Sequence, residues 1–179
     1  VIAKVERQID VGNLKNAERA LKGLLSQRLS PEQTRRAEKM LAKTALSASE
    51  EKNAAGDLIG AKKSLSAHLS VYGSGPDAET LWDRLDHYSI SLGKKLEADG
   101  KEKQALHQYA AVRDSSLYKV EAQKGISRIW LKSQHQQRQE QTIVQLLKEG
   151  ETHFAKKRYL TPVNRNAYAV YQAVLVLDP

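Results

Sequence analysis

The feature that most constrains this 179-residue chain is a regular spacing of glycines. Gly12, Gly56 and Gly100 lie 44 residues apart, and similar residues follow each of them at the same distances. Five positions later stands an alanine, and nine positions later a large apolar residue: Ala17, Ala61 and Ala105, then Leu21, Leu65 and Tyr109. A fixed period of this length is typical of architectures built from repeated units. The chain is therefore expected to fold from copies of one small structural unit.

Each unit of the period is predicted to be a helical hairpin. Glycine can adopt the left-handed conformation that ends a helix, and Asn13 and Asp57, which follow two of the glycines, are good N-caps for a second helix. Ser30 followed by Pro31 is a further helix-start signal. No alternation of β-branched residues supports a strand. The sequence thus predicts an all-α fold with hairpins at about 1–30, 31–73, 76–114 and 115–179.

The third and fourth hairpins resemble the tetratricopeptide repeat. The residues that carry this resemblance in the third hairpin are Leu92, Gly93, Leu96, Gly100, Ala105, Tyr109 and Val112. In the last hairpin Ala167, Tyr171 and Val174 repeat the offsets of the final three, and Pro179 follows as a closing proline. The period of 44 exceeds the family's usual length of about 34 residues. The resemblance implies a superhelical stack of antiparallel hairpins, an α-solenoid, forming a single domain over residues 1–179.

The last hairpin departs most from the period. Counting back from Ala167, its first helix should end near Lys157, and the segment Leu160–Asn164 then lengthens the turn. Residues 115–158 contain no proline, so they could form one very long helix, but residues 132–142 include no apolar residue. A helix that is polar all round is solvated or broken. We favour a break or an exposed bridge there over a buried straight helix.

No motif of catalytic chemistry is present in the sequence. There is no cysteine, no Walker-type glycine loop, no nucleophile elbow and no pair of histidines one helical turn apart. The segment Gly73–Pro76 looks like a phosphate loop, but it precedes no strand–helix unit and is interpreted as a linker. We therefore expect no catalytic residue, no cofactor and no metal, and a chain that is not an enzyme.

The histidines and tryptophans are interpreted as ordinary packing and surface residues. His68 stands at a packing position and is predicted to be a core histidine, whereas the others are predicted to lie on the surface: His87, His107, His135 and His153. Trp82 and Trp130 lie on apolar helix faces and are predicted to pack in the core. An exposed tryptophan would instead mark an interface.

The resemblance implies a protein-binding function and a set of candidate residues. In this family the first helices of the hairpins line a concave face that holds extended peptides or helices of partner proteins. The groove positions fall three, six and thirteen residues before each turn glycine, and here they are Asn53, Glu50 and Lys43, then Glu97, Lys94 and His87. Such side chains could hold a peptide backbone or a carboxylate. The alternative is that they are ordinary surface charges.

The net charge of +8 leaves a second class of function open. A positive field suits nucleic acid as well as acidic proteins, so a basic nucleic-acid-binding helical repeat is the alternative to a protein–protein interaction module. The stretch around residues 132–142 lacks the interleaved aromatic residues that stack on bases, which makes nucleic acid the weaker alternative. The apolar residues of the last helix, 167–177, predict self-association through that helix.

The cellular compartment of the protein is predicted only from the resemblance of one turn to known repeats. The turn before Val176-Leu-Asp-Pro179 resembles variant repeats of proteobacterial envelope proteins, which implies a periplasmic module of a larger bacterial envelope protein. A cytoplasmic location is the alternative. No window reaches the roughly 18 apolar residues of a membrane span, so no membrane contact is expected from this segment. The chain opens at Val1 rather than methionine, so an upstream membrane anchor is conceivable.

Overall fold

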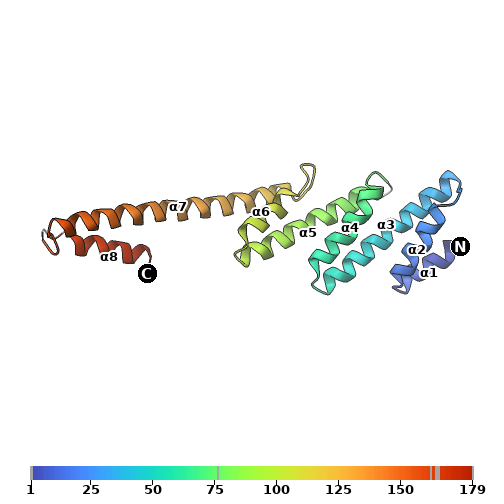
Figure 1. The fold of residues 1–179 in the computed structure, drawn as a ribbon. Coiled ribbons are helices and arrows are strands. Elements are labelled where there is room, and N and C mark those ends of the chain that lie inside the picture. The colour runs from blue at the N-terminus through green and yellow to red at the C-terminus, as the bar shows by residue number, and fades with distance from the viewer. Residues whose placement is uncertain (1, 76, 162, 164–165, 179) are drawn as a thin grey trace. The chain divides into compact units, whose positions relative to one another are not determined.

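A computed structural model describes residues 2–75, 77–161, 163 and 166–178, and all of the regular structure within these residues is α-helical (Figure 1). The helices are α1 (Ile2–Asp10), α2 (Leu14–Leu25), α3 (Pro31–Ala54), α4 (Leu58–Tyr72), α5 (Ala78–Ala98), α6 (Glu102–Ala110), α7 (Lys119–Ala155) and α8 (Ala167–Leu177). The all-helical fold class is confirmed. Pro76, Asn164 and Pro179, which bound segments named above, lie outside the described residues.

Local capping signals explain where the helices begin. At α3 the Ser30 hydroxyl accepts a hydrogen bond from the Gln33 backbone N–H at 3.2 Å, and the Gln33 side chain accepts from the Ser30 N–H at 3.1 Å. At α4 the Asp57 carboxylate accepts from the Gly60 N–H at 2.8 Å. Both predicted caps are confirmed. Asn13 stands at the N-cap position of α2 as predicted, but its side chain makes no capping hydrogen bond there.

The turn glycines end their helices in one shared geometry. Gly12, Gly56 and Gly100 have φ of +76°, +80° and +72°. Each turn contains the same two backbone hydrogen bonds. At the third turn the Gly100 N–H donates to the Glu97 carbonyl at 3.1 Å, and the Lys101 N–H donates to the Leu96 carbonyl at 2.8 Å. Lys157, with φ of +57°, makes the same pair of bonds after α7. The fourth turn therefore lies where the sequence predicted it, with lysine in place of glycine.

The turn geometry predicts opposite effects for two substitutions. Gly100→Val is expected to lower the free energy of unfolding by about 1 kcal/mol or more, because a β-branched residue is disfavoured at φ near +70°. Lys157→Gly is expected to raise it by about 1 kcal/mol, since glycine has no Cβ to strain in that conformation. Denaturant titration of both variants measures the effects. An unchanged stability of Gly100→Val would contradict the role assigned to this turn.

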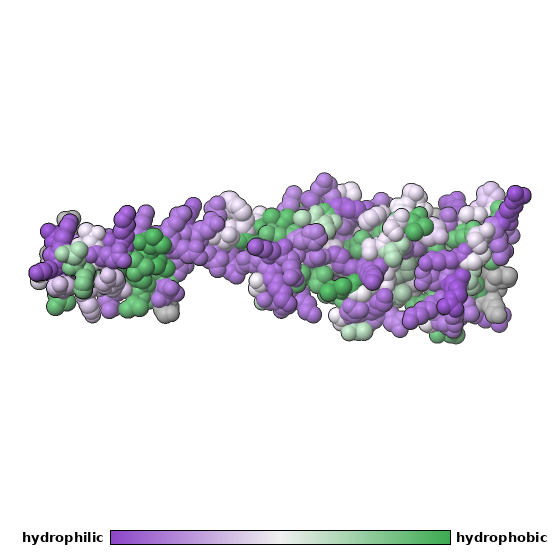
Figure 2. Space-filling view, in the orientation of Figure 1, coloured by the Kyte–Doolittle hydropathy of each residue, from purple (hydrophilic) through white to green (hydrophobic). Residues whose placement is uncertain are grey.

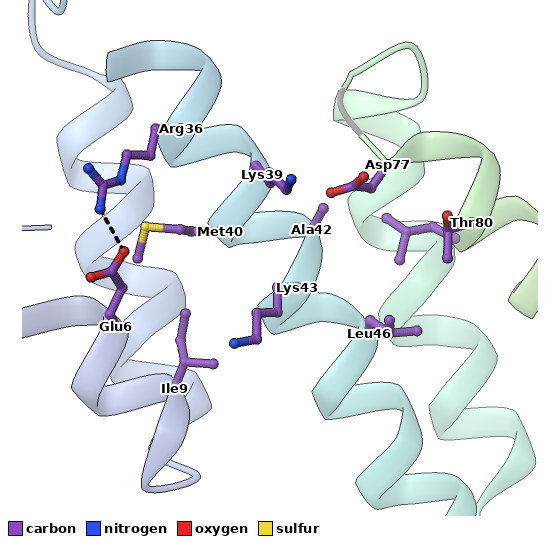
Figure 3. Close-up of a pocket in the computed structure, with 11 residues that line it drawn as sticks. Glu6, Ile9, Arg36, Lys39, Met40, Ala42, Lys43, Leu46, Asp77 and Thr80 are labelled. Carbon is purple, nitrogen blue, oxygen red and sulfur yellow. Dashed lines mark hydrogen bonds and ion pairs between the residues drawn. The ribbon is translucent and has the colours of Figure 1, made fainter. Parts of the chain in front are cut away.

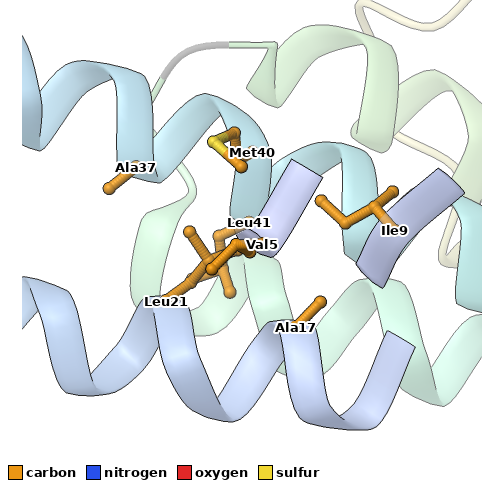
Figure 4. Packing of buried hydrophobic residues seen from close by; sticks show 7 residues of the cluster. All are labelled: Val5, Ile9, Ala17, Leu21, Ala37, Met40 and Leu41. Atoms are coloured by element: carbon orange, nitrogen blue, oxygen red, sulfur yellow. The ribbon is translucent and has the colours of Figure 1, made fainter. Parts of the chain in front are cut away.

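The chain divides into two compact units, residues 1–126 and 127–179, and a single domain over the whole chain stays a prediction. In the first unit each helix from α1 to α6 packs against the next one, and α3 also contacts α1 and α5. The turn alanines Ala17, Ala61 and Ala105 are fully buried. Two apolar clusters form the core. One, shown in Figure 4, contains Val5, Ile9, Ala17, Leu21, Ala37, Met40 and Leu41; the other is centred on Leu65, Leu81 and Tyr88.

The second unit contains most of α7 together with α8. Helix α7 is continuous over 37 residues, so a break at residues 132–142 is wrong, while the exposed bridge is confirmed. Figure 2 shows hydrophilic side chains along this part of the helix. The segment is rich in Gln, Lys, Arg and Glu, whose helix propensity is high, so it stays helical without an apolar face. Gln139 also donates a side-chain hydrogen bond to the Leu177 carbonyl of α8.

Three aromatic predictions need correction. Trp130 is 58% exposed and does not pack in the core. His153 is only 9% exposed, with Nε2 3.4 Å from Glu149, because α8 and its turn cover the end of α7. His87 is half-buried, and its ring lies beside those of Tyr88 and Tyr118. His68 is buried beside Tyr72 as predicted, and Trp82 is half-buried.

Helix α8 leaves apolar side chains at the surface of the second unit. Tyr168, Leu175 and Val176 are exposed, whereas Tyr171 is half-buried against Gly150 of α7. Figure 2 shows hydrophobic surface at the C-terminal end of α8. The uncovered face predicted for this helix is therefore present. Association of two copies through it stays a prediction.

Candidate functional site

Two of the predicted groove residues form ion pairs between neighbouring hairpins, and Glu6 of the first hairpin forms a third such pair. Glu50 of α3 pairs with Arg84 of α5 at 2.9 Å, and Lys94 of α5 pairs with Glu121 of α7. Glu6, which stands six residues before Gly12 as Glu50 does before Gly56, pairs with Arg36 of α3 at 2.9 Å. Exposed ion pairs of this kind contribute about 0–1 kcal/mol each. Glu50 and Lys94 therefore lie where successive first helices meet.

The other candidates lie at separate places in the first unit. Glu97 accepts a hydrogen bond from the Tyr109 hydroxyl at 2.7 Å, which joins α5 to α6. Asn53 is exposed near the end of α3, and His87 packs against tyrosine rings as described above. The structure does not bring the six residues Lys43, Glu50, Asn53, His87, Lys94 and Glu97 together at one cavity. Their part in partner binding stays a prediction.

A cavity of about 630 Å³ opens between α1, α3 and the start of α5, and we call it the first-helix groove (Figure 3). Its floor is apolar and is formed by Ile9, Met40, Ala42, Leu46 and Leu81. All except Leu46 are nearly inaccessible to solvent, so the floor is the outer surface of the core. Because the core already holds these floor residues in place, an apolar side chain can bind to them with little further loss of conformational entropy.

The rim of the first-helix groove carries both signs of charge. Glu6 and Arg36 form the ion pair described above, and Asp77 and Thr80 approach from α5. Lys39 and Lys43 of α3 stand four residues apart and both line the groove, where their side chains extend in different directions (Figure 3). Lys43 is the predicted candidate that lines this groove. Lys39 and Met40 were missed, although their spacing of four and three residues from Lys43 was a usable signal.

The arrangement suits binding of a segment with an apolar side chain and a carboxylate. The floor would take the apolar group, and the ammonium groups of Lys39 and Lys43 would hold the acid through charge-assisted hydrogen bonds. Within the described residues no three His, Asp or Glu side chains are placed to hold a metal ion. The described helices also include none that is both long and apolar enough to cross a membrane.

Comparison of this chain with family models, with curated proteins and with solved structures finds no match.

Proposed function

We propose that this chain is a non-catalytic protein-binding scaffold of the tetratricopeptide kind, and that a peptide segment of a partner protein occupies the first-helix groove. The observation that carries this proposal is the apolar cavity between α1, α3 and α5, with Lys39 and Lys43 on its rim. Contacts between α1 and α3 and between α3 and α5 support a stack in which first helices line one face. The shared turn geometry at residues 12, 56, 100 and 157 supports a common hairpin unit.

The mixed rim favours a protein partner over nucleic acid. Glu6 and Asp77 line the groove beside the lysines, and their carboxylates would repel a phosphate backbone. None of the described lining residues is aromatic, so no stacking platform for bases is present there. A peptide can match both signs of charge and can also place an apolar side chain on the floor.

Selection from a random peptide library displayed on phage tests the proposal. Enriched peptides are expected to carry an apolar residue near an acidic one. Their affinity is expected to fall about tenfold or more for the double variant Lys39→Glu/Lys43→Glu, because two ammonium contacts become repulsive. The matched control is Lys15→Glu/Lys63→Glu, which changes the charge equally at exposed positions outside the groove and should alter affinity less than about twofold.

Two results would contradict the proposal. One is equal loss of affinity in the two double variants, which would show that net charge, not the groove, decides binding. The other is a failure to enrich any peptide, together with tight salt-dependent binding of single-stranded DNA, which would favour the nucleic-acid alternative.

A further inference from the structure

A second groove of about 460 Å³ lies elsewhere in the first unit, between α4 and α6, with α5 beneath it. We call it the second-helix groove. Leu92 and Leu96 of α5 form its apolar floor, and Ile59 of α4 forms part of its wall. Ile59 is 68% exposed. The groove therefore offers an apolar surface that α1–α6 leave uncovered.

The charge of this groove differs from that of the first-helix groove. Lys62 of α4 and Lys103 of α6 are at its edge, and His107 stands one helical turn after Lys103. None of the described residues that line it is acidic. A groove whose charged lining residues are basic attracts a carboxylate and disfavours a basic segment. The first-helix groove, in contrast, contains Glu6 and Asp77.

Lys62 shows that the groove is partly shielded from water. Its side chain reaches across to α6 and donates a hydrogen bond to Gln108. Burial lowers the pKa of the Lys62 ammonium group, and the negative charge of Asp86 acts against that shift. An ammonium group has three N–H donors, so an arriving carboxylate can accept from Lys62 while Gln108 keeps its bond. A carboxylate placed there would offset part of the cost of burying the charge.

We propose that the second-helix groove binds an acidic segment of a partner protein. An apolar side chain of that segment lies on Ile59, Leu92 and Leu96, and its carboxylates bind Lys62 and Lys103. Nucleic acid is a poorer fit, because the described lining residues include no Phe, Tyr or Trp and a phosphate backbone gains nothing from an apolar floor. This binding is separate from that proposed for the first-helix groove.

Fluorescence anisotropy with defined probes tests the inference. The protein is the full chain carrying Lys39→Glu/Lys43→Glu, so that binding in the first-helix groove does not contribute. Four labelled probes are compared at physiological salt: a peptide alternating aspartate and leucine, one alternating aspartate and serine, one alternating lysine and leucine, and oligo-dT. The aspartate–leucine peptide is expected to bind at least about tenfold tighter than each of the other three.

Matched variants locate the binding. Lys103→Glu is expected to weaken the aspartate–leucine peptide about tenfold, whereas Lys63→Glu, an equal charge change on an exposed residue outside the groove, should change it less than about twofold. Ile59→Ser is expected to weaken it about fivefold, and Val71→Ser should not. Val71 is the control because it is on the same helix with a similar exposure, 69%.

Each remaining outcome overturns the inference. Equal effects of Lys103→Glu and Lys63→Glu would show attraction to net charge alone. Tighter binding of oligo-dT would assign the groove to nucleic acid. Absence of binding by both acidic peptides would show that the groove holds no acidic segment, whatever the outcome of peptide selection on the first-helix groove.

Discussion

Replacing Arg113 with methionine is expected to lower the free energy of unfolding by about 3 kcal/mol, because it leaves the Asp86 carboxylate buried without its cationic partner. Asp86 is 2% exposed. Its Oδ2 lies 2.9 Å from Nε of Arg113, and its Oδ1 accepts a longer bond, 3.3 Å, from the Arg113 backbone N–H. The pair joins α5 to the segment that follows α6.

Other contacts of Arg113 contribute less to this effect. Its two terminal nitrogens reach Glu79 at 3.0 Å and Asp83 at 2.9 Å, and both of these carboxylates are exposed. Its guanidinium also lies 5.3 Å from the centre of the Trp82 ring. Desolvation disfavours the charge of Arg113, but hydrogen bonds and attraction from Glu79 and Asp86 outweigh it, so the pKa of Arg113 is raised. The large loss on substitution is expected from Asp86, since only that partner is buried.

Equilibrium unfolding in denaturant measures the effect against a matched control. Arg84→Met removes an arginine of α5 that also pairs with a carboxylate, but its partner Glu50 is exposed, so the expected loss is about 0.5 kcal/mol. Arg113→Met/Asp86→Asn should recover part of the stability, because the buried charge is removed as well. If Arg113→Met costs no more than Arg84→Met, the network around Asp86 does not stabilise this fold.

The parts of the fold that could be predicted from sequence are those set by local chemistry. Gly56 with Asp57, and Ser30 with Pro31, each specify a helix end or start through backbone conformation and capping, whatever surrounds them. The turn alanines could be predicted because close approach of two helices allows only a small side chain. The fourth turn at Lys157 was predicted by counting back from Ala167 with the spacing of the other units, although lysine has no preference for a positive φ.

The parts that could not be predicted depend on which surfaces meet. Trp130 and Leu131 follow the buried Ile129 on α7, and an apolar run does not tell which of its members face a neighbour. Continuity of α7 through its polar segment was missed because the absence of an apolar face was weighed above helix propensity. At the site, Glu50 and Lys94 were predicted as groove residues, but their pairing with Arg84 and Glu121 could not be predicted, because those residues are far away in sequence.

The grooves were hard to predict for a related reason. The spacing rule counted back from each glycine and so selected Lys43, which lines the first-helix groove. The same rule could not show that Met40 and Leu81 would form a floor, because that depends on how α3 and α5 pack. The second-helix groove lies between α4 and α6 and was not anticipated at all, since the second helices were treated only as packing elements.

A second large effect is expected from Gly93→Val, which should lower the free energy of unfolding by about 3 kcal/mol through overpacking. A Cβ atom at Gly93 would lie 2.6 Å from the Tyr109 ring, and one at Gly125 would lie 2.5 Å from it. The ring thus fills the space between two glycines, on α5 and α7. The hydrogen bond from the Tyr109 hydroxyl to Glu97 fixes its position, so the ring has little room to move aside.

The chain's own period predicts which substitution restores the packing. Gly93 stands seven residues before the turn glycine Gly100. At the same distance before the first two turn glycines stand Val5 and Ser49, and in those two units a leucine takes the position of Tyr109. In the last hairpin Gly150 again meets a tyrosine ring, that of Tyr171. Units with glycine seven residues before the turn thus have tyrosine at the facing position, and units with a larger residue there have leucine. Tyr109→Leu should therefore make room for a valine at position 93.

A double-mutant cycle on positions 93 and 109 checks this size complementarity by chemical denaturation. Gly93→Val/Tyr109→Leu is expected to be more stable than the sum of the single effects by about 1–2 kcal/mol. Gly23→Val is the control, because a Cβ there has no neighbour within 4 Å and the helix propensities of the two residues differ little, by about 0.3 kcal/mol. Additive effects at positions 93 and 109 would show that the valine is accommodated by movement of the helices, and that the Tyr109 ring does not set the spacing between α5 and α7.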